Sequence, residues 1–485
     1  MKVQVISKEI IKPSTPTPPH LRNFKLSLLD QLLPPFYIPI VIFYPANDGH
    51  NDQTSNANIL KKSLPETLTR FYPIAGRMRD NISIDCNDEG VDYIEAKVNA
   101  VMSDFMSVDV VHRLHPSYIT VDVVAKEAQL AVQVNLFACG GIAISICLSH
   151  KIADGCTVLT FINSWAATAR VALNREIVYP TFDSAAIFPA LPPEVQVSSL
   201  ESNNSIRGEN VVTKLFLFNA SKISAIRARI AASRSSNVLS KYPTRSEAIS
   251  ALVWKSFMET SRVKVTRDQY TYSAASRKPI IIRSRANFVV NLRPWLSPPL
   301  PHVSFGNIIT DALAESTIMV FKESPLGFGE TLDGLISQLR LGVSKINDEY
   351  IRQLHEGDVE FIKALEEASH HSNGENTDEK AQICWISSLC SLPLYETDFG
   401  WGKPSWFVLN TFSEFKNSVF LVDTKCGAGI EAWVSLEEED MVIFEKDQDI
   451  LQYATLHTPD PVVGFTNYPS LRHGNTTEEP ALSRL

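Results

Sequence analysis

The chain has 485 residues, more than one hydrophobic core usually organises, so its length predicts two domains. Hydrophobic residues make up 44% and charged residues 20% of it, as in an ordinary globular enzyme. The formal net charge of -9 argues against an electrostatic nucleic-acid binder. No apolar run reaches the ~20 residues of a membrane span, and the N-terminus lacks the apolar stretch of a secretory signal. We therefore expect a cytoplasmic protein that binds neither nucleic acid nor membrane.

The seven cysteines are scattered and form no Cys-x-x-Cys pair. Most of them lie in apolar, strand-like surroundings, which is typical of reduced core residues. No ligand set for zinc is visible, so the sequence predicts no metal site.

The first part of the chain predicts a mixture of strands and helices. Strands are expected at residues 3–11, 38–45, 82–86, 91–96, 130–137 and 141–148. Turn residues predict one hairpin from 82–86 and 91–96 and another from 130–137 and 141–148. Apolar residues at helical spacing predict a helix ending near Phe71 and a second one over 157–169.

His150 stands directly after the apolar strand 142–148, in the segment Ser149-His150-Lys151-Ile152-Ala153-Asp154-Gly155. A histidine at a strand end is held rigidly and can still face a cleft. Its imidazole titrates near neutral pH, so it is suited to remove a proton from a hydroxyl group. A lone histidine beside an apolar run is, however, more often a hydrogen-bonded structural residue, and this alternative stays open on the segment alone.

A stretch rich in Pro, Ser and Asn, from 183 to 208, predicts a linker, and a second set of elements follows it. Strands are expected at 211–218, 288–292, 419–423 and 429–435, and helices at 220–232 and 248–259. Thr244 and Glu247 have the spacing of a capping box before the second of these helices. After about Ala454 the periodicity stops, which predicts a disordered tail.

A second motif lies far downstream, at Asp398-Phe399-Gly400-Trp401-Gly402. His-x-x-x-Asp-Gly in the first half, followed by Asp-Phe-Gly-Trp-Gly in the last fifth, resembles the plant BAHD acyl-CoA-dependent acyltransferases. The resemblance extends over roughly residues 5–454, and within that family it is closest to the alkaloid acetyltransferases.

This resemblance implies an α/β fold of the chloramphenicol acetyltransferase type, with two domains that are each a mixed β-sheet flanked by helices. A channel between the domains would admit acyl-CoA from one side and the acceptor from the other. The expected N-terminal domain is 1–190, completed by about 398–423, and 191–210 is the linker. The C-terminal domain would comprise 211–397 and 424–457, and 458–485 is the tail.

The resemblance also implies the chemistry, which is transfer of an acyl group, most often acetyl from acetyl-CoA, to an alcohol acceptor (EC 2.3.1.-). His150 would be the general base in a direct ternary complex of protein, thioester and alcohol. The acceptor would be a plant specialised metabolite such as an alkaloid or terpenoid. No permanently bound cofactor is implied, and a monomer is expected.

The resemblance also implies structural roles for the other motif residues. Asp154 would cap the following helix and pair with an arginine, instead of orienting His150. Asp398 would form a buried ion pair with Arg293 of the segment Asn291-Leu292-Arg293. Gly400 and Gly402 would allow bends around the packing surface of Trp401.

Coenzyme A contacts are expected from the second domain, at Ser246, Lys255, Ser387 and Ser388. One departure from the family pattern is Leu389, which stands where alkaloid-type enzymes usually have a tryptophan. This departure predicts an acceptor cavity of different shape.

Several alternatives remain at this point. A longer or branched acyl-CoA, or a sugar or amine acceptor, would fit the same motifs. A condensation domain usually has a second histidine where Ser149 stands, and a dihydrolipoyl acyltransferase core usually follows lipoyl-type modules that are not seen here. A non-catalytic metabolite-binding protein on the same fold would leave His150 without a role.

Overall fold

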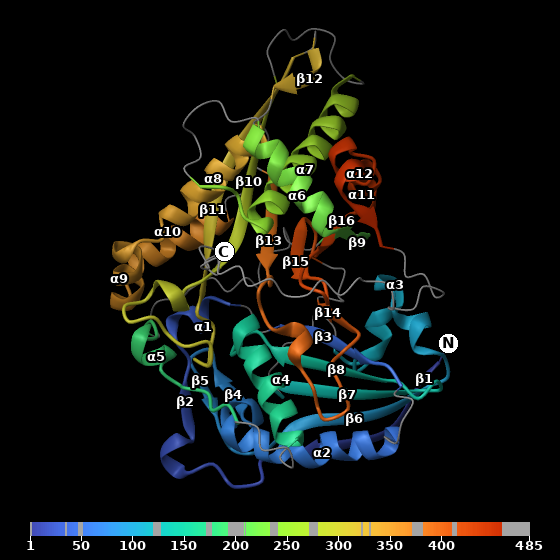
Figure 1. Cartoon of the computed structure of the whole chain (residues 1–485). Helices are drawn as coiled ribbons and strands as arrows, with labels where there is room; N and C mark the ends of the chain where they lie inside the picture. Colours follow the sequence, from blue (N-terminus) through green and yellow to red (C-terminus); the bar gives the residue numbers. More distant parts are fainter. Residues whose placement is uncertain are drawn as a thin grey trace.

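The computed structural model describes residues 2–33, 36–46, 52–119, 128–170, 177–192, 208, 210–232, 241–270, 280–321, 324–328, 331–370, 382–409 and 415–457. Two large sheets, each with its own helices, lie one above the other in Figure 1, and a small third sheet accompanies the lower one. The fold is therefore mixed α/β with two sheet-containing domains, as the sequence predicts.

The first sheet has the strand order β1-β6-β7-β8-β3-β14. Its strands are β1 (Val3–Ile11), β3 (Tyr37–Tyr44), β6 (Val91–Val98), β7 (Leu130–Phe137), β8 (Ile142–Ser149) and β14 (Trp406–Leu409). Only β6 and β7 pair in parallel. All eight residues of β8 are buried because both its edges are paired and α2 (Gln53–Arg70) and α4 (Gly155–Ala169) pack together within the same core. The strand that leads to His150 is thus fixed on every side.

One predicted hairpin is confirmed and the other is wrong. β7 and β8 pair as an antiparallel hairpin. In contrast, β5 (Ser83–Asp85) pairs with β2 (Asn23–Lys25) and β4 (Arg77–Asp80), while β6 lies between β1 and β7. Gly90 has a φ of 91° and lies so close to β1 that a Cβ there would be 2.4 Å from the Ile11 carbonyl oxygen. The turn therefore sends the chain into another sheet, between β1 and β7, instead of back along β5.

The second sheet has the order β12-β11-β10-β13-β15-β16-β9-β17. Its strands are β9 (Val211–Phe218), β10 (Ile280–Asn291), β11 (Ile309–Phe321), β12 (Ser324–Phe328), β13 (Gln382–Ser388), β15 (Ser418–Asp423), β16 (Ile430–Glu437) and β17 (Thr455–Leu456). The long antiparallel pair β10–β11 extends to the top of Figure 1.

Helices cover one face of this second sheet, and the apolar side chains between the helices and the sheet form the second core. The helices are α6 (Ala220–Ala232), α7 (Arg245–Tyr270), α8 (Leu332–Ser344), α9 (Asp348–Glu356), α10 (Val359–His370), α11 (Glu438–Phe444) and α12 (Gln448–Tyr453). The predicted capping box is confirmed: the Thr244 N–H donates to the Glu247 carboxylate at 2.9 Å, and the Glu247 N–H donates to Thr244 Oγ1 at 3.3 Å. Short helices elsewhere are α1 (Leu28–Leu32), α3 (Val108–Val111) and α5 (Ser184–Ile187).

The chain crosses back to the first domain after β13, but only briefly. β14 pairs with β3 at the edge of the first sheet. β15 does not follow it there, because it pairs with β13 in parallel and with β16 antiparallel inside the second sheet. The expectation that 398–423 as a whole completes the first domain is therefore wrong for Ser418–Asp423. Residues 410–414, between the two strands, lie outside the described residues.

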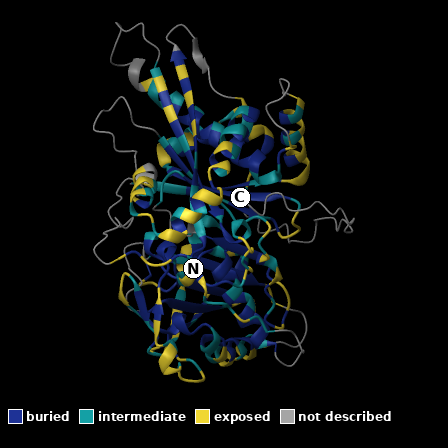
Figure 2. Ribbon diagram, turned by 90° about the vertical axis from the view of Figure 1, so that its left-hand side faces the viewer, coloured by how far each residue is buried: buried dark blue, intermediate teal, exposed yellow. Residues whose placement is uncertain are grey.

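Two large buried cores correspond to the two sheets, and Figure 2 shows the buried residues running through both. Residues from the second sheet, Leu215, Val422 and Trp433, belong to the first core, so the two domains share packed apolar surface. The predicted linker, except for its ends, and the predicted tail lie outside the described residues.

Candidate active site at the junction of the two domains

His150 lies at the end of β8 and is held by residues from distant parts of the chain. Its backbone N–H donates to the Phe36 carbonyl at 2.8 Å, and the Phe36 ring meets the imidazole edge-on with centroids 5.3 Å apart. The amide of Asn307, which precedes β11 of the second domain, donates from Nδ2 to the His150 carbonyl at 2.8 Å. The half-buried imidazole therefore sits where the two domains meet.

Asn307 also fixes the tautomer of the imidazole. Its Nδ2 and its backbone N–H both donate to Asp30 Oδ1, at 2.9 Å and 2.8 Å, so the orientation of the amide is set by a buried carboxylate. The amide oxygen is then the atom that faces His150 Nδ1, at 3.2 Å. An amide oxygen only accepts, so Nδ1 must carry the hydrogen and Nε2 keeps its lone pair. Nε2 makes no hydrogen bond to any residue that the structure describes.

Asp30 is in turn fixed by its own helix. Its carboxylate accepts from the Ser27 N–H at 2.9 Å and from the Ser27 hydroxyl at 2.7 Å, in a capping box at the start of α1. Burial raises the pKa of Asp30, although the hydrogen bonds from Asn307 and Ser27 oppose that effect. The sequence showed both Asn307 and Asp30 without indicating their role, because only the fold brings them beside His150.

The surroundings of His150 favour its neutral form. Burial lowers the pKa of His150 below its ordinary value, and this effect exceeds the opposing influences of the Asp154 charge and the Asn307 hydrogen bond. A neutral imidazole with a free Nε2 lone pair is the form that can accept a proton near neutral pH.

Asp154 does not bond to the imidazole. One carboxylate oxygen accepts from the Thr157 N–H at 2.9 Å and caps α4, and the other accepts from the Ile308 N–H at 3.0 Å. Both oxygens also accept from Arg293, at 2.7 and 3.1 Å, in an ion pair that is fully buried. Burial alone would raise the pKa of Asp154, but the charge and hydrogen bonds of Arg293 outweigh it and the pKa is lowered.

The predicted ion pair between Asp398 and Arg293 is wrong, because the two residues lie at opposite ends of α4. Arg293 binds Asp154 at the N-terminus of that helix, whereas Asp398 lies 3.4 Å from Arg170, the C-cap residue. A helix of this length spans about 22 Å, so one arginine cannot serve both carboxylates.

Asp398 instead organises its own motif. Its Oδ1 accepts from the Gly400 N–H at 2.8 Å and from the Gly402 N–H at 3.0 Å. Both glycines have positive φ values, 115° and 110°, which other residues rarely adopt. The tight turn stacks Phe399 on Trp401 at 5.6 Å, and Phe399 meets Trp165 of α4 edge-on at 5.1 Å. The motif therefore packs the far end of α4 and is remote from His150.

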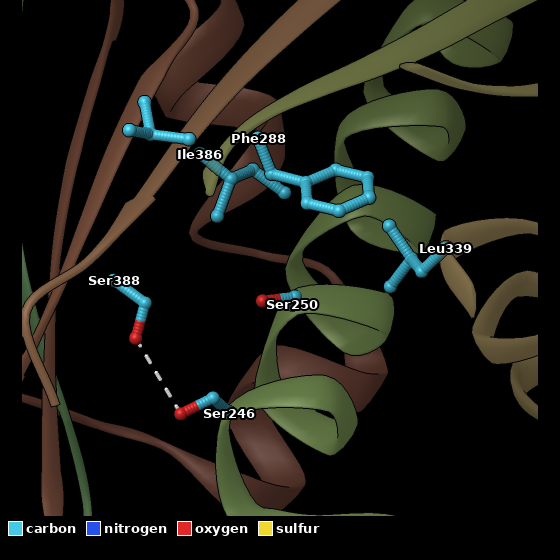
Figure 3. Close-up of a pocket in the computed structure, with 7 residues that line it drawn as sticks. Ser246, Ser250, Phe288, Leu339, Ile386 and Ser388 are labelled. Atoms are coloured by element: carbon cyan, nitrogen blue, oxygen red, sulfur yellow. Dashed lines mark hydrogen bonds between the residues drawn. The ribbon is translucent and has the colours of Figure 1, made fainter. Parts of the chain in front are cut away.

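A pocket in the second domain contains two of the four residues expected to contact coenzyme A (Figure 3). Ser246 of α7 and Ser388 of β13 point toward one another across it, and their hydroxyls are 3.5 Å apart. The remaining lining residues are Ser250, Phe288, Val289, Leu339 and Ile386. Ser387 precedes Ser388 on a strand and so faces the opposite side of the sheet.

Lys255 does not reach this pocket. It lies nine residues beyond Ser246, or two and a half helical turns, and therefore on the other face of α7. Its ammonium group pairs with Asp449 of α12 at 2.7 Å. The assignment of Lys255 to coenzyme A thus conflicts with its position, while Ser246 and Ser388 share one site.

Leu389, the departure from the family pattern, lies against the start of α4. A Cβ added to Gly155 would be 2.9 Å from Leu389 Cδ2, so the leucine covers the first turn of the helix that follows the His150 motif. Residue 389 is therefore close to the chain segment that carries the histidine.

Within the described ranges no group of three His, Cys, Asp or Glu side chains could hold a metal ion. None of the helices in those ranges is both long and apolar enough to cross a bilayer. All seven cysteines are free thiols.

Comparisons with known proteins place the chain in a family. The model of the Transferase family matches residues 1–451. Salutaridinol 7-O-acetyltransferase of Papaver somniferum is 37% identical over 483 residues, with 91% of this chain and 96% of that protein covered. Limonoid 1-O-acetyltransferase of Citrus sinensis is 35% identical over 471 residues, with 94% and 99% covered.

Among solved structures, vinorine synthase superimposes with a TM-score of 0.74 at 33% identity, covering 95% of this chain and all of that one. With 95% of this chain covered, the match includes both sheet-containing domains. The chain therefore belongs to this transferase family, the BAHD acyltransferases.

Proposed function

We propose that this BAHD acyltransferase (EC 2.3.1.-) transfers an acetyl group from acetyl-CoA to a hydroxyl of an alkaloid or terpenoid, with His150 as the general base. Membership of the family establishes the coarser activity, which is acyl-CoA-dependent O-acyl transfer. The names of the relatives, acetyltransferases of alkaloids and limonoids, support acetyl as the donor group and these two acceptor classes. The observation that carries the proposal is the half-buried His150 with its Nδ1 bound by Asn307 and its Nε2 free.

In the proposed reaction the alcohol oxygen attacks the thioester carbonyl while His150 Nε2 takes the hydroxyl proton. The C–S bond of the tetrahedral intermediate then breaks, and the imidazolium returns that proton to the departing thiolate. Nδ1 keeps its own hydrogen throughout, bound to the Asn307 oxygen. The thioester is already activated, so the protein's main task is this proton transfer and the alignment of the two substrates.

Direct transfer, without an acyl-enzyme, is supported by the state of the nearby thiols. Cys156 lies six residues after His150, yet burial raises its pKa to about 12. A thiol with such a pKa is almost entirely protonated at neutral pH and is a poor nucleophile. We therefore expect a ternary complex, with initial-rate plots for the two substrates that intersect.

We also propose that the protein acts as a monomer in the cytoplasm. The seven free thiols support a reducing compartment, because buried thiols are typical of proteins that do not rely on disulfides. Size-exclusion chromatography with light scattering would test the monomer directly.

The test is replacement of the base. The variant His150→Gln should lower turnover by about 10²- to 10⁴-fold, the usual contribution of a general base. Free thiol release from acetyl-CoA would be measured with panels of hydroxylated alkaloids and terpenoids. His302→Gln is the matched control, since His302 is an exposed histidine and should keep full activity. A folded His150→Gln protein with turnover within a few-fold of the wild type would refute the proposed mechanism.

A further inference from the structure

The face of the second sheet that carries Asn307 is opposite to the face that packs in the second core. Side chains alternate along β11, and its even-numbered residues from Ile308 to Val320 that are apolar belong to the core under the helices. The odd-numbered positions, 307 to 319, therefore share the opposite face. The Leu292 N–H donates to the Ile308 carbonyl at 2.9 Å, so the extended pairing reaches back to the residue after Asn307.

On this face, exposure rises along β11 away from Asn307. Asn307 is buried, Ile309, Asp311 and Leu313 are half-buried, and Glu315 is exposed. On β10, Asn287 is buried, Val289 and Arg285 on either side of it are half-buried, and Arg283 is exposed. Among the described residues, β11 therefore runs from a buried end beside the imidazole to an exposed end at Glu315.

Asp311 is a charged residue on this face of β11. It makes no hydrogen bond and no ion pair with any residue that the structure describes. Burial raises the pKa of Asp311 to about 6, with no cation opposing the effect, so the group is an anion at pH 7.5. Four residues separate it from Asn307, which places the two Cα atoms at most about 14 Å apart.

Asn287 is a second unsatisfied group on the same face. It is 1% exposed, and both its amide oxygen and its amide nitrogen lack a hydrogen-bond partner. Asn287 is paired with Leu313 and Asp311 with Val289, so Asn287 and Asp311 are diagonal neighbours with Cα atoms about 7–8 Å apart. Buried amides are nearly always hydrogen-bonded, so an unpaired one next to an unpaired carboxylate indicates that a ligand supplies the missing partners.

Trp385 completes the group from the next strand. It is paired with Asn287 in the parallel register of β10 and β13, and its half-buried side chain lies on the same face. Ser387, which the sequence placed with coenzyme A, is two residues along on that face. A carboxylate, an amide and the face of an indole are the groups that bind a protonated amine, by charge, hydrogen bonding and cation–π attraction.

We propose that Asp311, Asn287 and Trp385 form an acceptor subsite that binds the ammonium group of a basic alkaloid while its hydroxyl reaches His150. This inference rests on the proposed O-acetyltransferase function and narrows its acceptor from two classes to one. A neutral terpenoid would leave the Asp311 carboxylate desolvated and unpaired, which disfavours its binding.

The experiment compares acceptors with and without a charge. Kinetics at saturating acetyl-CoA would be measured with hydroxylated tertiary-amine alkaloids and with neutral hydroxylated triterpenoids of similar size. Asp311→Asn keeps the shape of the side chain and removes its charge. We expect it to raise KM for the amine acceptors about tenfold or more, while kcat, the KM for acetyl-CoA and the KM for any neutral acceptor change less than twofold.

Glu315→Gln is the matched control because Glu315 lies on the same strand and face, but its carboxylate is already bound to Arg285 at 2.7 Å. It removes the same charge and should leave every KM unchanged. If both variants raise the KM for the amine acceptors equally, the effect comes from the overall negative charge of this face, and the subsite is refuted. The subsite is also refuted if Asp311→Asn leaves the amine KM unchanged, or if the wild type acetylates neutral triterpenoids in preference to amines.

Binding measured without turnover separates this inference from the proposed function. Titration of the amine alkaloids into the acetyl-CoA-free protein, followed by calorimetry, should show about tenfold weaker binding to Asp311→Asn than to the wild type. If that difference appears but His150→Gln still turns over, the mechanism fails and the subsite stands. If acetyl transfer depends on His150 but no binding difference appears, the subsite fails alone.

Discussion

At the scale of the residue, the chemistry depends on the protonation of one imidazole. His150 has Asn307 on Nδ1, and the direction of that amide is set by Asp30. Because burial lowers the pKa of His150, the ring is neutral through the physiological range. The same carboxamide that orients the ring raises its pKa, since a hydrogen bond to its oxygen favours the protonated form.

The first prediction concerns the pH profile of this base. A base must be unprotonated to act, so kcat/KM should be constant from pH 8 down to about 6.5, the ordinary pKa of histidine, and fall only below it. In Asn307→Ala the hydrogen bond that raises the pKa is lost, so the acid limb should move to still lower pH. The pH-independent value of kcat/KM should also fall, because the imidazole ring is no longer oriented by the Asn307 side chain. If the acid limb of the kcat/KM profile moved to higher pH in Asn307→Ala, the assigned hydrogen bond would be contradicted.

At the scale of the element, α4 organises the site by its two ends. Its N-terminus is capped by Asp154 and tied to the second domain through Arg293, while Arg170 at its C-terminus meets Asp398. The two acidic motif residues therefore have unequal environments. The Asp154 side chain is 1% exposed and the Asp398 side chain 25% exposed.

The second prediction compares these two carboxylates. Asp154→Asn would leave the buried Arg293 charge uncompensated, and we expect it to lower the free energy of unfolding by about 3–5 kcal/mol. Asp398→Asn keeps an oxygen for the two glycine N–H groups and loses only a partly exposed ion pair, so about 1 kcal/mol is expected. Urea unfolding of both variants at pH 7 measures the difference. A larger loss for Asp398→Asn than for Asp154→Asn would contradict the greater contribution assigned to the buried pair of Asp154 and Arg293.

At the scale of the whole molecule, the two sheets are joined by aromatic packing that surrounds a buried acid. Trp406 of β14 stacks on Trp433 of β16, with centroids 5.8 Å apart and an interplanar angle of 25°. Glu431 lies two residues before Trp433 on the same strand face, and its Oε2 has no hydrogen-bond partner among the described residues. Burial raises the pKa of Glu431 to about 7. The neighbouring Trp406 and Trp433 side chains favour the charged carboxylate, but burial outweighs them.

The third prediction follows from this raised pKa. The folded protein binds the Glu431 proton more tightly than the unfolded chain, so the contribution of this group to stability is greatest below its ordinary pKa of 4.5 and declines as the pH rises toward 7. Glu431→Gln stays neutral at every pH. We therefore expect it to raise the free energy of unfolding by about 3 kcal/mol at pH 8 and to change it little at pH 4.5.

Thermal unfolding of Glu431→Gln and the wild type across this pH range provides the measurement. Glu437→Gln is a suitable control on the same strand, because Glu437 is less buried and its carboxylate already pairs with Lys416 at 2.9 Å. An equal gain at pH 4.5 and pH 8 would mean that the carboxyl is not protonated on folding.

The sequence by itself determined the family, the strand that ends at His150 and the helix that begins after Asp154. These features depend on residues close together in the chain, where apolar periodicity, a capping aspartate and two short motifs suffice. It also identified the capping box of α7 and the hairpin of β7 and β8, which are equally local.

Only the tertiary structure decided which distant residues meet. Two aspartates and several arginines fit the same ion-pair rule, and the length of α4 assigned Arg293 to Asp154 and Arg170 to Asp398. The partner strands of β5 and β15, the separation of Lys255 from Ser246, and the contact of Asn307 with His150 were likewise not visible in the sequence. Pairing across long sequence separations depends on how whole sheets pack, and a pattern read along the chain carries no information on it.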